Sequence, residues 1–291
     1  MSSIFQPVEI PENITPAFFQ EHIHFTDNSK AGITLDMPAM DACPGMTEAC
    51  LKKITKKDGK EGKYPTCYAL QGLYKWSQDR FRQTKSLIEK AIDQWGEKEA
   101  ARLVYEEFKR RKFLKGTISG AQYLAIFRKL RFHGSGDCYS IKYIRFLIEL
   151  AKLMEADGYG IWLYTRSFII PTLLPSLRLL ASRPNVNMLL SADYWNYQEA
   201  INVIESDYDQ AFAGVACMHH AGDSWPREVE KTGRLVVLFP VHVGKQNIQE
   251  RLTGMSGNVK TCPAILGAWK DDRACLKCSN ICTSDLPVSV H

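Results

Sequence analysis

The sequence predicts an α/β protein with a TIM-like (β/α) barrel, either full or partial. Short apolar segments with the pattern of strands alternate with longer segments of helical periodicity, which is typical of parallel βαβ units. Polar or reactive residues follow the predicted strands. The 291 residues contain no linker-like stretch and no internal repeat, so we expect one domain over residues 1–291.

The first predicted strand covers residues 31–37 and is ended by Pro38. A cysteine-containing loop over residues 39–66 follows it. The other strands are expected at residues 129–133, 160–164, 186–191, 211–218 and 235–241. Helical periodicity predicts helices at residues 68–91, 97–113, 140–156, 169–182 and 197–206, with a break near Gly96 between the first two.

Composition excludes several classes of protein. The formal net charge of +5 is mild, so it allows an anionic partner without requiring one. We find no secretory signal and no apolar run that could span a bilayer, so we expect a cytoplasmic protein without membrane association. In a reducing compartment the nine cysteines are expected to bind metal or do redox chemistry rather than form disulfides.

Candidate site residues follow the predicted strands. In a β/α barrel the loops at this end of the strands converge on one mouth, which holds the active site. The residues concerned are Asp41, Cys43, His133, Asp137, Thr165, Arg166, Ser191, Asp193, His219, His220 and His242. We expect Arg166 to pair with a substrate anion, and His133, Asp137 and Asp193 to serve proton transfer or orientation. The alternative is that any α/β protein places polar residues where its loops begin.

Four cysteines lie in the tail over residues 257–291, which we expect to be a metal-binding segment at the barrel mouth. They are Cys262, Cys275, Cys278 and Cys282. The last three have the spacing C-x2-C-x3-C, and four thiolates are the usual complement of a [4Fe–4S] cluster. Tetrahedral zinc, which also takes four cysteines, is the alternative.

A second group, Cys43, Cys50 and Cys67, follows the first strand. Three thiols at this place suit a cluster with one open iron, so the chain is expected to hold one or two clusters. Cys67 begins a predicted helix, whose backbone N–H groups stabilise a thiolate. Six lysines between Cys50 and Cys67 would offset the negative charge of a cluster or hold an anionic partner. We expect Cys217, in an apolar run, to be a buried small hydrophobe, and leave Cys138 unassigned.

The motifs CPGMTEAC…CYA, RFHGSGDC, WLYTRS, NMLLSAD and CPA…C-x2-C-x3-C occur in this order between Met37 and Cys282. Together they resemble the bacteriophage gene product 88 family. The resemblance implies a phage-encoded protein of β/α-barrel type that holds a cluster. The chain departs from the family in the sixteen residues between Cys50 and Cys67, where the family has only a few. This stretch can loop out, because the entropy of loop closure grows slowly with length.

There is a looser similarity to radical S-adenosylmethionine enzymes, which place three cysteines after the first strand of a partial barrel and a Gly-rich acidic turn after the second. Cys43, Cys50 and Cys67 match the first feature, and the turn Gly134–Asp137 matches the second. The similarity makes S-adenosylmethionine a further candidate cofactor. The compact cysteine spacing of that superfamily is absent here.

Three functions follow. The first is a cluster-binding barrel with redox or radical chemistry on a small molecule or nucleotide. The second is a structural metal centre in a module that binds nucleic acid weakly or binds a host protein, supported by the lysine-rich stretch and the basic run at residues 109–112. The third is a zinc-dependent hydrolase using His219, His220 or His242, although the first two are adjacent and point in different directions.

Overall fold

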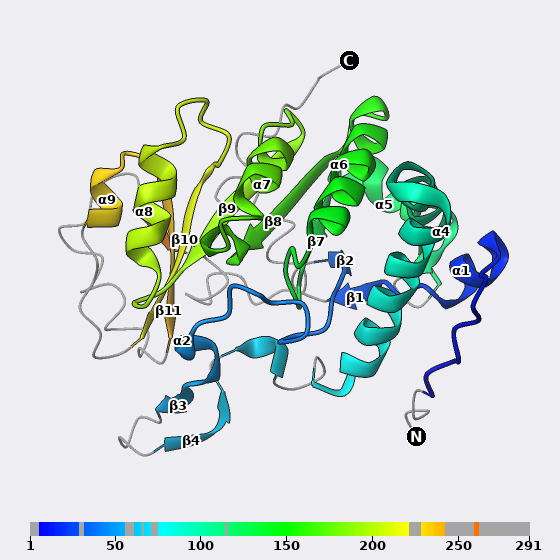
Figure 1. Cartoon of the computed structure of the whole chain (residues 1–291), viewed down its shortest axis with the longest axis horizontal. Helices are drawn as coiled ribbons and strands as arrows, with labels where there is room; N and C mark the ends of the chain where they lie inside the picture. The colour runs from blue at the N-terminus through cyan, green and yellow to red at the C-terminus, as the bar shows by residue number, and fades with distance from the viewer. Residues whose placement is uncertain are drawn as a thin grey trace.

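The computed structural model describes residues 6–28, 32–55, 61–65, 67–70, 75–113, 116–220, 228–241 and 259–261. Eight of its strands form one sheet in the order β1-β2-β7-β8-β9-β10-β11-β12 (Figure 1). Their bounds are Thr26–Asn28 for β1, Gly32–Leu35 for β2, Lys129–Phe132 for β7, Gly160–Thr165 for β8, Val186–Ala192 for β9, Gly214–His220 for β10, Leu235–Val241 for β11 and Val259–Thr261 for β12.

The sheet is parallel from β2 to β12, and each strand lies beside the one before it in this series. The short β1 pairs with β2 in the antiparallel sense. β1 therefore occupies the free edge of β2, with which the last strand of a closed barrel would have to pair. Among the described strands the sheet is therefore open, and the full barrel is not formed.

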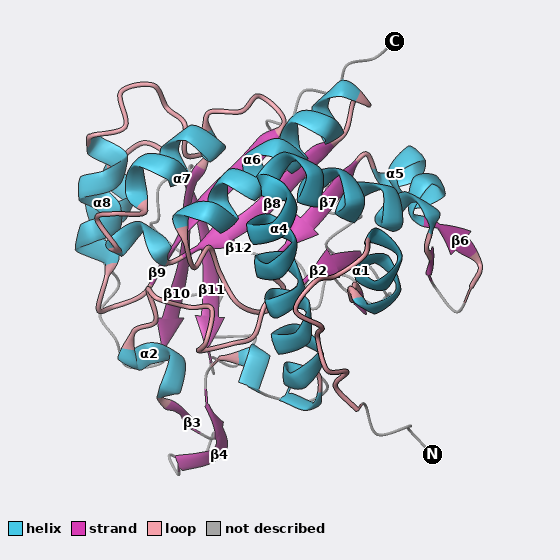
Figure 2. Ribbon diagram, turned by 45° about the vertical axis from the view of Figure 1, so that its right-hand side comes forward, coloured by secondary structure: helices cyan, strands magenta, loops and turns pink. Residues whose placement is uncertain are grey.

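The helices that connect the parallel strands cover one face of this sheet. Figures 1 and 2 show α4, α6, α7 and α8 on the same side of the strands. Right-handed crossovers between strands that are adjacent and in chain order place every connection on one face. The bounds are Gln78–Arg110 for α4, Ile141–Ala156 for α6, Leu174–Ala181 for α7 and Tyr197–Glu205 for α8.

The main core lies between these helices and alternate residues of the strands. In β8 the residues that pack toward the helices are Ile161 and Leu163, and in β9 they include Met188 and Leu190. All four are at most 2% exposed. The residues between them point to the opposite face of the sheet, as the period of two requires. We call that opposite face the back face.

The predicted strands and most predicted helices are present, with shifted ends. The first two helices form the kinked α4, whose break is at Gly96 with φ of 80°, and residues 68–70 form only a 3-10 turn, η1. The helix expected at 169–182 is shorter. A 3-10 turn, η2 (Ser167–Ile169), precedes α7. Pro175 lies in the first turn of α7, where a backbone N–H would have no partner within the helix, so the proline costs no hydrogen bond.

Several short elements were not expected from periodicity. They are α1 (Pro16–His22), α2 (Glu48–Leu51), α5 (Gly120–Phe127), α9 (Glu228–Lys231), the hairpin of β3 (Lys53–Thr55) and β4 (Glu61–Pro65), and the hairpin of β5 (Lys112–Phe113) and β6 (Ile118–Ser119). The β3–β4 hairpin lies in the lysine-rich stretch and projects away from the main sheet (Figure 1). Within the described ranges, no helix has the length and apolar character needed to cross a membrane.

Candidate metal centre

The three N-terminal cysteines come from three consecutive pieces of chain after β2. Cys43 lies on the loop, Cys50 in α2, and Cys67 directly before η1. The backbone N–H of Cys67 donates to the carbonyl of Cys50 at 3.0 Å. The stretch between these two residues therefore loops out as the β3–β4 hairpin and returns to its starting point, as loop-closure entropy allows. All three cysteines are partly buried.

The three thiols lie close enough to influence one another's ionisation. Burial raises the pKa of Cys43, and the negative charges of Asp137, Cys67 and Cys50 raise it further. Burial also raises the pKa of Cys67, with a further contribution from Cys50. Backbone N–H groups of Ala69 and Leu70 act in the other direction on Cys67. The effect expected from a helix start at Cys67 is thus present, although the helix is a single 3-10 turn.

One buried cation stands beside this group. The side chain of Arg166 at the end of β8 is 11% exposed and forms an ion pair with the fully buried Asp193 after β9. The hydroxyl of Thr47, on the cysteine loop, donates to Asp193 at 2.5 Å and accepts from Arg166 at 2.8 Å. The positive charge of Arg166 lowers the pKa of Cys67, and the negative charge of Cys50 raises the pKa of Arg166. The cysteine loop is therefore fastened to the carboxyl ends of β8 and β9 by polar contacts.

Close backbone packing holds the same loop against β8. A Cβ atom at Gly45 would lie 2.1 Å from the backbone oxygen of Arg166. No side chain can be placed there without moving one of the two segments, which explains a glycine between Cys43 and Cys50. The exposed Lys52, next to α2, lies with Nζ 5.6 Å from the ring centroid of Trp195, which follows β9. Figure 2 shows α2 beside the carboxyl ends of β10 and β11.

The Gly-rich acidic turn after β7 is organised by two buried carboxylates. Asp137 accepts from the Thr165 hydroxyl and from the backbone N–H groups of Cys138 and Arg166, each at 2.6 Å. Asp36, after β2, accepts from the backbone N–H of Ser135 at 2.9 Å. Burial raises the pKa of both Asp137 and Asp36. These contacts fix the turn to the ends of β2 and β8.

His133 begins this turn in a left-handed conformation, with φ of 58°. Its Nε2 lies 3.0 Å from the hydroxyl of Tyr143, and its Nδ1 has no hydrogen-bond partner among the described residues. Burial, assisted by the positive charge of Arg131, lowers its pKa to about 3. The imidazole is therefore neutral near pH 7, which suits a hydrogen-bonding or ligating role better than that of a charged acid.

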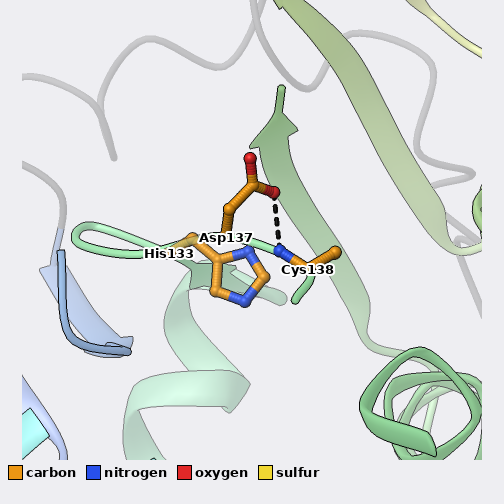
Figure 3. Close-up of side chains that lie close together, drawn as sticks. All are labelled: His133, Asp137 and Cys138. Atoms are coloured by element: carbon orange, nitrogen blue, oxygen red, sulfur yellow. Dashed lines mark hydrogen bonds between the residues drawn. The ribbon is translucent and has the colours of Figure 1, made fainter. Parts of the chain in front are cut away.

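Two arrangements of ligating atoms can be distinguished. His133, Asp137 and Cys138 are buried and have ligand atoms within 4.8 Å of one another (Figure 3). The thiols of Cys43, Cys50 and Cys67 form the second arrangement, in which the charges of Cys50 and Cys67 act on Cys43. Thiolates of an iron–sulfur cube bind different irons, whereas a zinc ion takes all its thiolates itself.

The remaining predicted residues divide into two sets. Cys217 is buried in β10, as expected, and Cys138 is also buried. His219 and His220 lie in β10, at the end that was predicted to carry them. The four tail cysteines Cys262, Cys275, Cys278 and Cys282, together with His242, lie outside the described residues. Of the tail at 257–291 only β12 is described, and it adds a strand next to β11.

The arrangement of motifs around this loop is that of a known family. The family model described as Gene product 88 matches residues 18–282. The chain belongs to the Gene product 88 family. This confirms the family that the motifs resemble. No curated protein and no solved structure matches the chain. The similarity to radical S-adenosylmethionine enzymes receives no support from these comparisons.

Sequence reasoning missed two residues of this site. Thr47 joins the cysteine loop to Asp193 and Arg166, and Asp36 holds the turn after β7. Thr47 lies within the CPGMTEAC motif, so its position between two cysteines was an available signal. Asp36 was expected to lie inside the predicted strand at residues 31–37, so it was not considered as a site residue.

Proposed function

We propose that this member of the Gene product 88 family binds an iron–sulfur cluster, most simply [4Fe–4S], through Cys43, Cys50 and Cys67. The observation that carries the proposal is the return of Cys67 to Cys50 across sixteen intervening residues. A loop that needed only to connect β2 with α4 would gain nothing from bringing three thiols together. Burial raises the pKa of Cys43 and Cys67, so these two thiols stay protonated until a metal displaces their protons.

The number of loop thiols suits a cluster with one open iron. A cube takes one thiolate on each iron, so three cysteines leave one iron for an exogenous ligand. Cys43 and Cys67 approach from the loop side, and Arg166 stands on the sheet side with its charge close to two of the thiols. A cation at this position balances part of the negative charge of a thiolate-ligated cluster.

The function that follows is redox or radical chemistry on a small molecule or nucleotide. An iron–sulfur cluster supplies one-electron chemistry when it is bound. S-adenosylmethionine is the candidate ligand of the open iron, because the three thiols follow the first parallel strand and the Gly-rich acidic turn follows the second. The four tail cysteines are the candidate ligands of a second cluster. Asp137, His133 and Asp193 are buried and hold the surrounding turns, so in this proposal they act by positioning.

Anaerobic purification with assays of iron, inorganic sulfide and zinc tests the proposal. We expect about four irons per chain for one cluster and about eight for two. Single variants Cys43→Ala, Cys50→Ala and Cys67→Ala should each lose the iron and visible absorption of the loop site. Cys217→Ala is the matched control, because that thiol is buried in the core of the sheet.

The outcomes separate the alternatives. Iron that is unchanged in all three loop variants would show that the tail alone holds it. Zinc without sulfide would move the assignment to a zinc protein. Titration of S-adenosylmethionine into the reduced, loaded protein should change the electron paramagnetic resonance spectrum of the cluster if the open iron takes that ligand.

A further inference from the structure

The back face of the sheet carries one side chain from each of four adjacent strands at the same level. Thr34 of β2 is opposite Arg131 of β7, Arg131 is opposite Trp162 of β8, and Trp162 is opposite Asn187 of β9. Residues paired in register point to the same face, so these four side chains form a row. We call it the back-face row. It differs from the helix-covered face, whose residues at neighbouring positions are apolar.

Two members of the row are buried with polar atoms that the described chain does not satisfy. Asn187 is 3% exposed, and neither its Oδ1 nor its Nδ2 has a hydrogen-bond partner among the described residues. Trp162 is 2% exposed, and its indole Nε1 likewise has none there. A buried amide without partners destabilises a fold, and a leucine of similar size would avoid that cost. Such groups are retained where their partner is a ligand.

The third member supplies a positive charge and a flat surface. The guanidinium of Arg131 lies 4.9 Å from the ring centroid of Trp162 and 5.5 Å from that of Tyr164, which is two residues further along β8. These contacts with two nearly perpendicular rings hold the guanidinium in place. The charge of Arg131 acts on both Asp36 and His133 at the next level of the sheet. The row therefore favours a ligand with oxygen acceptors.

We propose that the back-face row binds a small molecule with an amide-type edge, in which a carbonyl stands beside an N–H group. The Nδ2 of Asn187 donates to the carbonyl, and its Oδ1 accepts from the N–H, as asparagine does in two-bond recognition of a base edge. The indole N–H of Trp162 donates to a further oxygen of the ligand. A nucleobase and a carboxamide both carry such an edge.

The row lies on the strands that lead to Arg166 and Asp193 at their carboxyl ends. A ligand held there by its amide-type edge extends toward the three loop thiols and is the substrate of the centre proposed above. The claim that the ligand is the substrate rests on the proposed function. The claim that the back-face row binds the ligand is independent of it, because these side chains recognise the ligand without a metal. Apo protein can therefore be used for the test.

Asn185 and Asn187 form a matched pair for the first experiment. Both are buried, but Nδ2 of Asn185 donates to the carbonyls of Ala151 and Tyr159, each at 2.9 Å. Thermal unfolding is measured for the full chain and for Asn187→Leu and Asn185→Leu. We expect Asn187→Leu to raise the Tm by about 2–4 °C and Asn185→Leu to lower it by at least as much. A fall in Tm for Asn187→Leu like that for Asn185→Leu would overturn the proposal, since Asn187 would then serve the fold.

The second experiment measures ligands on the apo wild type by thermal shift and calorimetry. The probes are inosine and uridine for the nucleobase edge, and nicotinamide and glutamine for the carboxamide edge. Binding of either group sustains the proposal and identifies the source of the edge. We expect Asn187→Leu to weaken that binding at least tenfold, because a site built for hydrogen bonds loses affinity when they are absent. No binding by any of the four probes, or equal binding by Asn187→Leu, would overturn it.

Discussion

The five described cysteines occupy two kinds of surroundings. Cys43, Cys50 and Cys67 are partly exposed in the segment that follows β2, at the carboxyl end of the sheet, where polar contacts hold that segment. Cys138 and Cys217 are at most 1% exposed and belong to the apolar core. Burial is the first cause of the raised pKa at Cys43, Cys67 and both core thiols, but the loop thiols also influence one another's charge. The comparison shows that position relative to the strand ends, rather than residue type, decides which thiols are available to a metal.

The largest effect is expected where the loop thiols are anchored. Arg166→Ala leaves the fully buried Asp193 without its cation, so we expect a loss of about 3–5 kcal/mol in the free energy of unfolding. The measurement is urea denaturation of the apo protein. The paired variant Arg166→Met with Asp193→Leu removes both charges and should recover most of the loss. An Arg166→Ala protein as stable as the wild type would show that the ion pair does not hold the loop.

A second difference should appear in thiol accessibility. We expect iodoacetamide to modify Cys43, Cys50 and Cys67 of the apo protein at least about tenfold faster than Cys138 and Cys217, because exposure limits the reaction. Mass spectrometry of peptides after timed labelling gives the rates. Loading with iron and sulfide under anaerobic conditions should protect the loop thiols only. Equal protection of all five would mean that loading merely stabilises the fold.

The buried thiol of Cys217 should affect the stability of the protein at high pH. Burial raises the pKa of Cys217 to about 12 from an ordinary value near 9, so the unfolded chain releases this proton first as pH rises. Keeping this thiol protonated therefore contributes fully to the free energy of unfolding below pH 9, and the contribution is lost as the pH rises from 9 to 12. Cys217→Ala should reduce the loss of stability of the apo protein between pH 9 and pH 10 by about 1 kcal/mol. Identical slopes in denaturation curves of the two proteins would contradict the burial of this thiol as a neutral group.

The smallest expected effect is a difference in stability between variants of a core cysteine and of a loop cysteine. Cys217→Ala should lower the free energy of unfolding at pH 7 by about 1 kcal/mol, because it removes a buried sulfur from the core. Cys50→Ala should change the stability of the apo protein by less than about 0.5 kcal/mol, because Cys50 is partly exposed. A large loss for Cys50→Ala without metal would give this thiol a structural role of its own.

The fold was predicted where a local pattern determines it. The alternation of strands with helices gave the parallel series from β2 to β11, because buried parallel strands are apolar runs bounded by turns. The open edge was not predictable, since the three residues of β1 carry no strand pattern and pair only because β2 offers an edge. The β3–β4 hairpin was also missed, because lysines are poor strand formers and hide the signal.

The candidate site shows the same division. The grouping of Cys43, Cys50 and Cys67 was predicted from their place after the first strand, while their return to one point depends on a backbone hydrogen bond that sequence cannot show. The back-face row was missed entirely. Arg131 and Asn187 are 56 positions apart, and only the strand register brings them to one level. The asparagine within the apolar run VNMLLS was the available signal, because its side-chain amide has few hydrogen-bond partners inside a buried strand.

The most direct test of the central claim is a Mössbauer spectrum of anaerobically loaded protein in which Cys262, Cys275, Cys278 and Cys282 are all replaced by serine. With the tail thiols removed, the three loop cysteines are the remaining group of thiols proposed to hold a cluster. We expect a spectrum of an iron–sulfur cluster with about four irons and four sulfides per chain, one iron of which changes when S-adenosylmethionine is added. A protein that folds but retains neither iron nor sulfide would contradict the assignment of the loop thiols as cluster ligands.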